Sequence, residues 1–155
     1  MFSILNLDEF NDDLSALSDG EAAELCQLLR ARLIDTVSHT GGHLASSLGA
    51  VEMIVAIHRV FQTGQDRLVF DVGHQCYAHK ILTGRNQAMK TLRTFGGIAG
   101  FPKPSESVCD AFVAGHASNS VSVAIGMARA RTLQHQNYHV LALLGDGALS
   151  GGLAY

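Results

Sequence analysis

The chain has 155 residues, which is enough for one ordinary domain, and 47% of them are hydrophobic. Charged residues make up only 16%, against about 25% in an average soluble domain, so we expect part of the surface to be covered, either in an oligomer or by the remainder of a longer chain. The net charge of -3, with no run of Lys or Arg, argues against a nucleic-acid partner and against a membrane-surface partner.

The N-terminal residues are acidic where an export or transit signal would be basic, and no apolar run is long enough to cross a bilayer. The sequence therefore favours the cytoplasm. Residues 1–18 show no clear periodicity, and we expect them to form an arm on a domain of residues 19–155. The cysteines, Cys26, Cys76 and Cys109, are odd in number and widely spaced, which favours buried thiols over disulfides or a structural zinc site.

Ser18 and Glu21 have the spacing of a capping box, and apolar residues follow at helical spacing, so we predict a helix over residues 19–38. Two glycines then end this helix and place His43 on a loop, where catalytic side chains are often held by a rigid scaffold. A second helix with a largely apolar face is predicted next. His58 lies inside it and is typical of a core or rim histidine rather than of a ligand.

Two short runs of residues, 67–72 and the apolar 140–144, predict β-strands. The second run is unbroken and rich in branched side chains, so we expect it to be buried on both faces. Each run is followed by a glycine and a polar side chain, His74 in one case and Asp146 in the other. Ligands bind at the carboxyl ends of parallel strands, and an Asp there can hold Mg²⁺ against a diphosphate. A Gly-Asp-Gly turn taken alone is better explained by backbone geometry, because the motif is short.

The segment between these strands is mostly irregular. Residues 78–81 predict a short helix with Lys80 available as a cation, and residues 83–106 predict a long loop with a helical turn near 86–93. A helix rich in small residues is predicted over residues 120–134, and the free amides at its start are expected to form an anion site.

The alternation of helices with buried strands predicts an α/β fold, a three-layer α/β/α arrangement with a mainly parallel sheet. Three Gly-His pairs and Asp146 then follow element boundaries, so their side chains are expected to converge at one edge of the sheet. One interpretation is a metal-dependent hydrolase with His43, His74, His116 and Asp146 as ligands, although the usual ligand spacings are absent. The other is a diphosphate cofactor held through Mg²⁺ on Asp146.

Several segments resemble the 1-deoxy-D-xylulose-5-phosphate synthase family, whose transketolase-like members depend on thiamine diphosphate. The resemblance runs from about residue 19 to residue 155. It is carried by HTGGHLASSLG at 39–49, FDVGHQCYAHKILTGR at 70–85, Gly96-Gly97 with Gly100-Phe101-Pro102, GHAS at 115–118 and GDGA at 145–148. The block that starts at Gly73 distinguishes this family from ordinary transketolases.

The resemblance implies the thiamin diphosphate-binding fold and a transferase that condenses pyruvate with glyceraldehyde 3-phosphate and releases carbon dioxide. Such enzymes serve the biosynthesis of isoprenoid precursors, thiamine and pyridoxal, and the intact protein would be a homodimer. By resemblance Asp146 is a Mg²⁺ ligand and His43 is catalytic, handling protons of the substrate. The cofactor is lined by residues from three loops: His74, Gly115, His116, Ala117, Gly147 and Ala148.

The departures from the family pattern are also informative. Ala117 stands where the family usually has Ser, and Ala78 stands where it usually has Pro. A further Mg²⁺ ligand, the activating glutamate and a second domain lie in the family beyond the position of Tyr155. We therefore expect an N-terminal fragment with an incomplete domain, inactive without the remainder of the synthase. The alternative is a non-catalytic remnant or a binding subunit of the same fold.

Overall fold

A computed structural model describes residue 7 and residues 14–155, so most of the expected N-terminal arm lies outside the described residues. The chain divides into two compact units. Unit 1 comprises Met1–Gln62 and His74–Gly100, and unit 2 comprises Thr63–Gly73 and Phe101–Tyr155. Each unit is described by itself.

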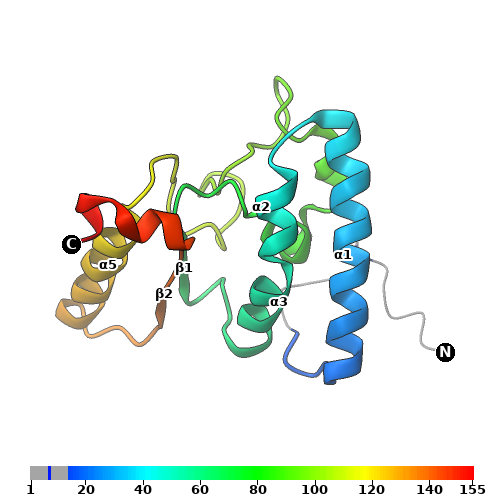
Figure 1. Ribbon diagram of the computed structural model, residues 1–155. Helices are drawn as coiled ribbons and strands as arrows, with labels where there is room; N and C mark the ends of the chain where they lie inside the picture. Colours follow the sequence, from blue (N-terminus) through cyan, green and yellow to red (C-terminus); the bar gives the residue numbers. More distant parts are fainter. Residues whose placement is uncertain (1–6, 8–13) are drawn as a thin grey trace. The chain divides into compact units, whose positions relative to one another are not determined.

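Unit 1 is helical. Its elements are α1 (Asp19–Thr40), α2 (Leu44–Gly49), α3 (Val51–Val60), α4 (Tyr77–Lys80), the π-helical η1 (Ile81–Arg85) and the 3₁₀-helical η2 (Gln87–Thr91). α1 packs against both α2 and α3 (Figure 1). The predicted helices are confirmed, and the residues expected only to lead into the second helix form the separate helix α2.

The start of α1 follows directly from its sequence. The Ser18 Oγ accepts a hydrogen bond from the Glu21 amide at 3.3 Å, and the Glu21 carboxylate accepts one from the Ser18 amide at 2.8 Å. This capping box satisfies two backbone donors that a helix start leaves free. The residues Leu25, Leu29 and Leu33, spaced by one helical turn, then form a buried stripe, so α1 is held by its apolar face.

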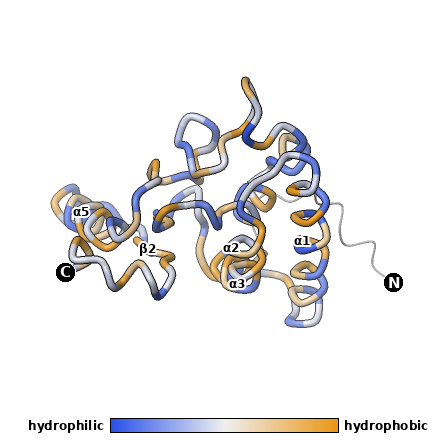
Figure 2. Tube along the Cα trace, turned by 45° about the horizontal axis from the view of Figure 1, so that its top comes forward, coloured by the Kyte–Doolittle hydropathy of each residue, from blue (hydrophilic) through white to orange (hydrophobic). Residues whose placement is uncertain are grey.

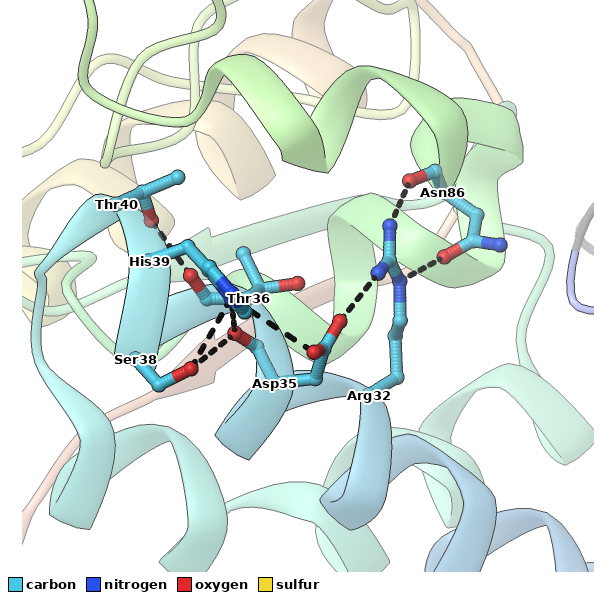
Figure 3. A network of polar contacts seen from close by, with 7 residues as sticks. All are labelled: Arg32, Asp35, Thr36, Ser38, His39, Thr40 and Asn86. Carbon is cyan, nitrogen blue, oxygen red and sulfur yellow. Dashed lines mark hydrogen bonds and ion pairs between the residues drawn. The ribbon is translucent and has the colours of Figure 1, made fainter.

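Arg32, in the C-terminal half of α1, joins this helix to Asn86, the residue before η2. Its Nε donates to the side-chain Oδ1 of Asn86 at 2.9 Å, and its Nη2 donates to the Asn86 carbonyl at 3.1 Å (Figure 3). Asn86 is buried, whereas Asp35, the other partner of Arg32, is largely exposed. The guanidinium therefore satisfies two acceptors of one buried residue, a role that suits its planar fork of donors.

α4 is buried on every side. Lys80 has no exposed surface, so the expectation that it is an available cation is wrong. All four residues of α4 are buried, so the aliphatic stem and the ammonium group of Lys80 both lie inside unit 1. His58 of α3 is 2% exposed, which confirms that it is a core histidine.

Unit 2 contains a parallel pair of strands, β1 (Arg67–Phe70) and β2 (Val140–Leu143), with Arg67 opposite Val140 and Phe70 opposite Leu143. Helix α5 (Ser120–Leu133) packs against both strands, and two 3₁₀ turns follow β2, η3 (Asp146–Ser150) and η4 (Gly152–Ala154). The helices and the parallel pair confirm an α/β fold. Both strands begin where the sequence predicts them and end one or two residues earlier.

β2 is less covered than its apolar sequence predicts. Only Leu143 is buried, so the expectation of a strand buried on both faces is wrong for the residues that the structure describes. Within this part of the chain β2 has β1 as its strand neighbour and α5 as its packed helix. Helix α5 also has exposed apolar side chains, since Ile125 and Leu133 are 65% and 66% exposed. Hydrophobic and hydrophilic positions alternate along this helix (Figure 2).

The three cysteines, Cys26, Cys76 and Cys109, are free, buried thiols, as predicted. Burial is the main cause that raises the pKa of the Cys26 thiol. In the described ranges, no helix is both long and apolar enough to cross a membrane.

Candidate functional site

The carboxylate predicted at the end of the second strand lies where expected. Asp146 is exposed and begins η3, three residues beyond Leu143, the buried last residue of β2. Its Oδ1 accepts a hydrogen bond from the amide of Gly147 at 2.9 Å. A Cβ atom built on Gly145 or on Gly147 would meet no atom within 4 Å, so the backbone on both sides of Asp146 faces open space. A ligand can therefore approach the Asp146 carboxylate without meeting a side chain on either neighbouring residue.

The start of α5 is not the open anion site that the sequence predicts. Asp71, which directly follows β1 and is 1% exposed, accepts hydrogen bonds from the amides of Ser118 at 2.9 Å and Ser120 at 3.1 Å. Burial disfavours the charged carboxylate, and hydrogen bonds from the α5 start outweigh it, so the pKa of Asp71 lies below its ordinary value. The Asp71 carboxylate thus accepts the hydrogen bonds of the Ser118 and Ser120 amides, which an external anion would otherwise accept.

The third Gly-His pair lies on the loop just before α5. Gly115, His116 and Ala117 are all exposed, and a Cβ atom on Gly115 would meet nothing within 4 Å. The next residue, Ser118, is buried, and its Oγ donates to the carbonyl of Ala148 at 2.7 Å. Unit 2 thus brings the loop at 115–117 to the turn at 146–148, as the sequence predicts for these two segments.

Unit 1 brings together the other two predicted residues. The rings of His43 and His74 meet edge to face, with their centroids 5.1 Å apart and an interplanar angle of 65°. His43 is exposed and immediately precedes α2, and His74 is partly buried. The Ser47 Oγ donates to the carbonyl of His74 at 3.2 Å, which fixes the backbone of His74 to α2.

His74 has the environment of a group that binds a ligand in its neutral form. Its Nδ1 is buried and has no hydrogen-bond partner in the described part of the chain. Burial, and then the charge of His43, lower the pKa of His74 below its ordinary value. A buried ring nitrogen without a partner costs free energy, so a polar group of a ligand would be stabilised there.

His43 is positioned by close packing at the glycine pair. A Cβ atom on Gly42 would lie 2.7 Å from the Tyr77 Oη, and the φ angle of Gly42 is +137°, so only glycine fits. The amide of His43 donates to the Tyr77 Oη at 3.4 Å. On the ring, the Nη1 of Arg93 lies 3.3 Å from the His43 Nδ1. Because a guanidinium only donates, Nδ1 accepts and the ring proton of neutral His43 lies on Nε2.

Sequence reasoning missed two residues of this arrangement, Asp71 and Arg93. Asp71 could have been found by the rule that selected Asp146, since it is also a carboxylate at the carboxyl end of a buried strand. Arg93 has a positive φ of 62°. Its side chain packs against Gly100, because a Cβ atom built on Gly100 would lie 3.0 Å from the Cγ of Arg93. The clustered glycines around it indicated a special backbone, although they did not indicate a contact with His43.

The described residues contain no group of three or more His, Cys, Asp or Glu side chains that could hold a metal ion. The four-ligand set of the metal-hydrolase interpretation therefore receives no support. A single carboxylate such as Asp146 holds Mg²⁺ only together with other oxygen ligands, and phosphate oxygens are the usual ones.

Known proteins match this chain over its whole described length. The family model described as 1-deoxy-D-xylulose-5-phosphate synthase matches residues 5–155. Proteins named 1-deoxy-D-xylulose-5-phosphate synthase from Natranaerobius thermophilus and Clostridium acetobutylicum are 54% identical over 155 residues and 51% identical over 154 residues. These matches cover 100% and 99% of this chain, but only 25% of each relative. A synthase from Thermus thermophilus is 54% identical over 150 residues, 96% of this chain and 24% of the relative. The chain thus spans about a quarter of the length of these relatives.

Proposed function

Because this chain belongs to the 1-deoxy-D-xylulose-5-phosphate synthase family, we propose that it contributes the diphosphate-binding part of such an enzyme. The reaction is the condensation of pyruvate with glyceraldehyde 3-phosphate to 1-deoxy-D-xylulose 5-phosphate and carbon dioxide, with thiamine diphosphate and Mg²⁺ as cofactors. The observation that carries the proposal is the exposed carboxylate of Asp146 beside the open Gly147. The hydrogen bond from Ser118 to Ala148 joins this turn to the 115–117 loop.

The residues of unit 2 fit a magnesium diphosphate. Asp146 would bind the metal ion, and Gly147 and Ala148 would lie against the diphosphate, because Gly147 has no side chain to obstruct it. Gly115, His116 and Ala117 would line the cofactor from the neighbouring loop. Ala117 has no hydroxyl, so any hydrogen bond from this position comes from its backbone.

The histidines of unit 1 would serve the reacting end of the cofactor. Thiamine diphosphate supplies the electron sink for decarboxylation of a 2-oxo acid, so the chain needs no nucleophile of its own. The buried, unpartnered Nδ1 of His74 would bind a polar atom of the cofactor. The Arg93 contact leaves the proton of His43 on Nε2, from which His43 would exchange protons with the substrate.

We further propose that residues 1–18 form an arm on a domain of residues 19–155, which belongs to a three-layer thiamin diphosphate-binding fold. The parallel pairing of β1 with β2 and the packing of α5 on both strands support the layered fold in this proposal. A homodimer of the full-length enzyme would cover apolar surface such as that of Ile125, which is 65% exposed.

The test measures binding of thiamine diphosphate with Mg²⁺, and synthesis of 1-deoxy-D-xylulose 5-phosphate, in the natural protein that contains this chain. Asp146→Asn should raise the Mg²⁺ concentration needed for binding by about tenfold or more, since the amide lacks the charge that attracts the ion. The matched control is Asp19→Asn, which removes a carboxylate that is 95% exposed on α1 and should leave binding unchanged.

Residues 1–155 alone span only 25% of the relatives' length and should show no decarboxylation of pyruvate. Turnover by the rigorously purified short chain would contradict this expectation. Cofactor binding without turnover in the natural protein would instead favour a binding subunit, and an unchanged Mg²⁺ requirement in Asp146→Asn would refute the assigned metal ligand.

A further inference from the structure

Asp71 lies at the point where three elements of unit 2 meet. Its backbone amide donates to the carbonyl of Leu143 at 2.8 Å, which extends the pairing of the two strands beyond their last residues. The following residue, Val72, has a positive φ of 57°, and the amide of Gly73 donates back to the Asp71 carbonyl at 2.6 Å. The chain therefore turns immediately after Asp71, and its buried carboxylate is held at the carboxyl ends of β1 and β2.

This carboxylate fixes the backbone that leads into α5. It accepts the amides of Ser118 and Ser120 through separate oxygens, Oδ1 at 2.9 Å and Oδ2 at 3.1 Å. A charged acceptor that is 1% exposed makes stronger hydrogen bonds than one in water. The position of Ser118 relative to the strand ends is thus set by both oxygens of one side chain.

Ser118 transmits this position to the turn that carries Asp146. Its φ is +71°, a left-handed conformation that a serine seldom adopts without being held there. In this conformation its Oγ donates to the Ala148 carbonyl at 2.7 Å. A Cβ atom on Gly151 would lie 2.1 Å from the same Oγ, so a glycine at 151 is required for the contact.

We infer that Asp71 is a positioning residue that sets the separation of the 115–117 loop from the 146–148 turn through Ser118. This inference rests on the proposed function, in which both segments bind the diphosphate of the cofactor. Asp71 itself acts only through the backbone of Ser118 and Ser120. Its role is to hold the two segments at a fixed distance, which lowers the free-energy cost of ordering them when the cofactor binds.

The test is Asp71→Asn in the natural protein that contains this chain. Asn keeps the shape of Asp, but its amide group places a donor against one of the two backbone N–H groups. The matched control is Asp66→Asn: Asp66 is also buried and accepts the amide of His139 at 2.7 Å, but at the opposite, amino end of the same strands. Both variants lose a buried charged acceptor, and only Asp71→Asn disturbs the cofactor loops.

The dissociation constant of thiamine diphosphate, measured by calorimetry at saturating Mg²⁺, should rise about 10- to 100-fold in Asp71→Asn and change by less than about threefold in Asp66→Asn. The half-saturating cofactor concentration for turnover should rise in parallel, while turnover at saturating cofactor stays within about threefold of the wild type. A merely structural role would lower the thermal midpoint of both variants and leave both dissociation constants alike, which would overturn the inference.

Ser118→Ala tests the second link in case Asp71→Asn does not fold. It keeps both Asp71 contacts to the backbone and removes only the hydrogen bond to Ala148, so the dissociation constant should rise about 3- to 10-fold. An unchanged dissociation constant would overturn the inference. If the wild-type protein binds no thiamine diphosphate at all, the proposed function fails, and the inference fails with it. If the wild type binds and Ser118→Ala binds equally well, only the inference fails.

Discussion

His58 of α3 and His79 of α4 form a hydrogen bond inside unit 1, with Nε2 of the first 2.9 Å from Nδ1 of the second. The two rings are 2% and 0% exposed. Since a hydrogen bond needs one donor and one acceptor, one of these nitrogens carries a proton and the other presents its lone pair. The bond therefore joins two helices that are far apart in the sequence through a matched pair of imidazoles.

The single variants His58→Leu and His79→Leu should each lower the free energy of unfolding by about 1–3 kcal/mol, because each leaves the other ring buried without this bond. The double variant should cost less than the sum, since it removes both polar groups. Urea denaturation of the chain provides the double-mutant cycle. Additivity within about 0.5 kcal/mol would show that the two rings do not interact.

Gly42 should tolerate alanine less well than its neighbour Gly41. At Gly41, φ is +73° and ψ is 174°, but a Cβ atom would meet nothing within 4 Å, so Gly41→Ala should cost about 1–3 kcal/mol for its backbone conformation alone. Gly42→Ala should cost about 1–3 kcal/mol more, because its Cβ would lie 2.7 Å from the Tyr77 Oη. Adding Tyr77→Phe should recover part of this excess in urea denaturation. A double variant no more stable than Gly42→Ala would refute the clash.

The lowered pKa of His74 should make unit 1 less stable in mild acid. The unfolded chain takes up a proton near pH 6.5, whereas folded His74 takes it up at a lower pH, because burial and the charge of His43 oppose protonation. The unfolded state then binds more protons, so the free energy of unfolding falls as pH falls through about 6.5.

His74→Gln should reduce this slope in urea denaturation between pH 8 and pH 5, and His135→Gln, which changes an exposed histidine of unit 2, should leave it intact. If the free energy of unfolding depends on pH equally steeply in His74→Gln and the wild type, His74 is not the group that causes the loss of stability in acid.

Arg32 should not be replaceable by lysine. An ammonium group cannot reproduce the two fork-shaped contacts with Asn86, at 2.9 and 3.1 Å, so Arg32→Lys should cost about 1–2 kcal/mol in urea denaturation. Arg30→Lys is the matched control, since Arg30 makes a similar fork on Glu52, whose side chain is 60% exposed. That variant should cost less than about 1 kcal/mol. Equal costs would show that the burial of Asn86 does not matter.

Local features of this chain could be predicted because their causes lie within a few residues of sequence. The Ser18–Glu21 capping box, the glycines after α1 and the first residues of β1 and β2 all follow from neighbouring side chains. The exposed position of Asp146 at the carboxyl end of β2 follows from strand geometry in the same way. The assignment of catalytic and cofactor roles to particular residues stays a prediction, since it rests on the resemblance to the family.

Other features depend on segments that meet only in the folded chain. Lys80 carries a charged side chain, which the sequence alone suggests is exposed, yet it is buried because helix α4 has no exposed side. β2 is apolar enough for a fully buried strand, yet its burial depends on how many elements cover it.

The start of α5 has the free amides of any helix, and only the tertiary structure supplies the carboxylate of Asp71, 47 residues away, to occupy them. The sequence by itself thus determined the family, the helix ends and the strand starts, because these depend on local side-chain chemistry. The tertiary structure decided which polar groups are buried and which of them meet, because solvation and long-range hydrogen bonds depend on packing between distant segments.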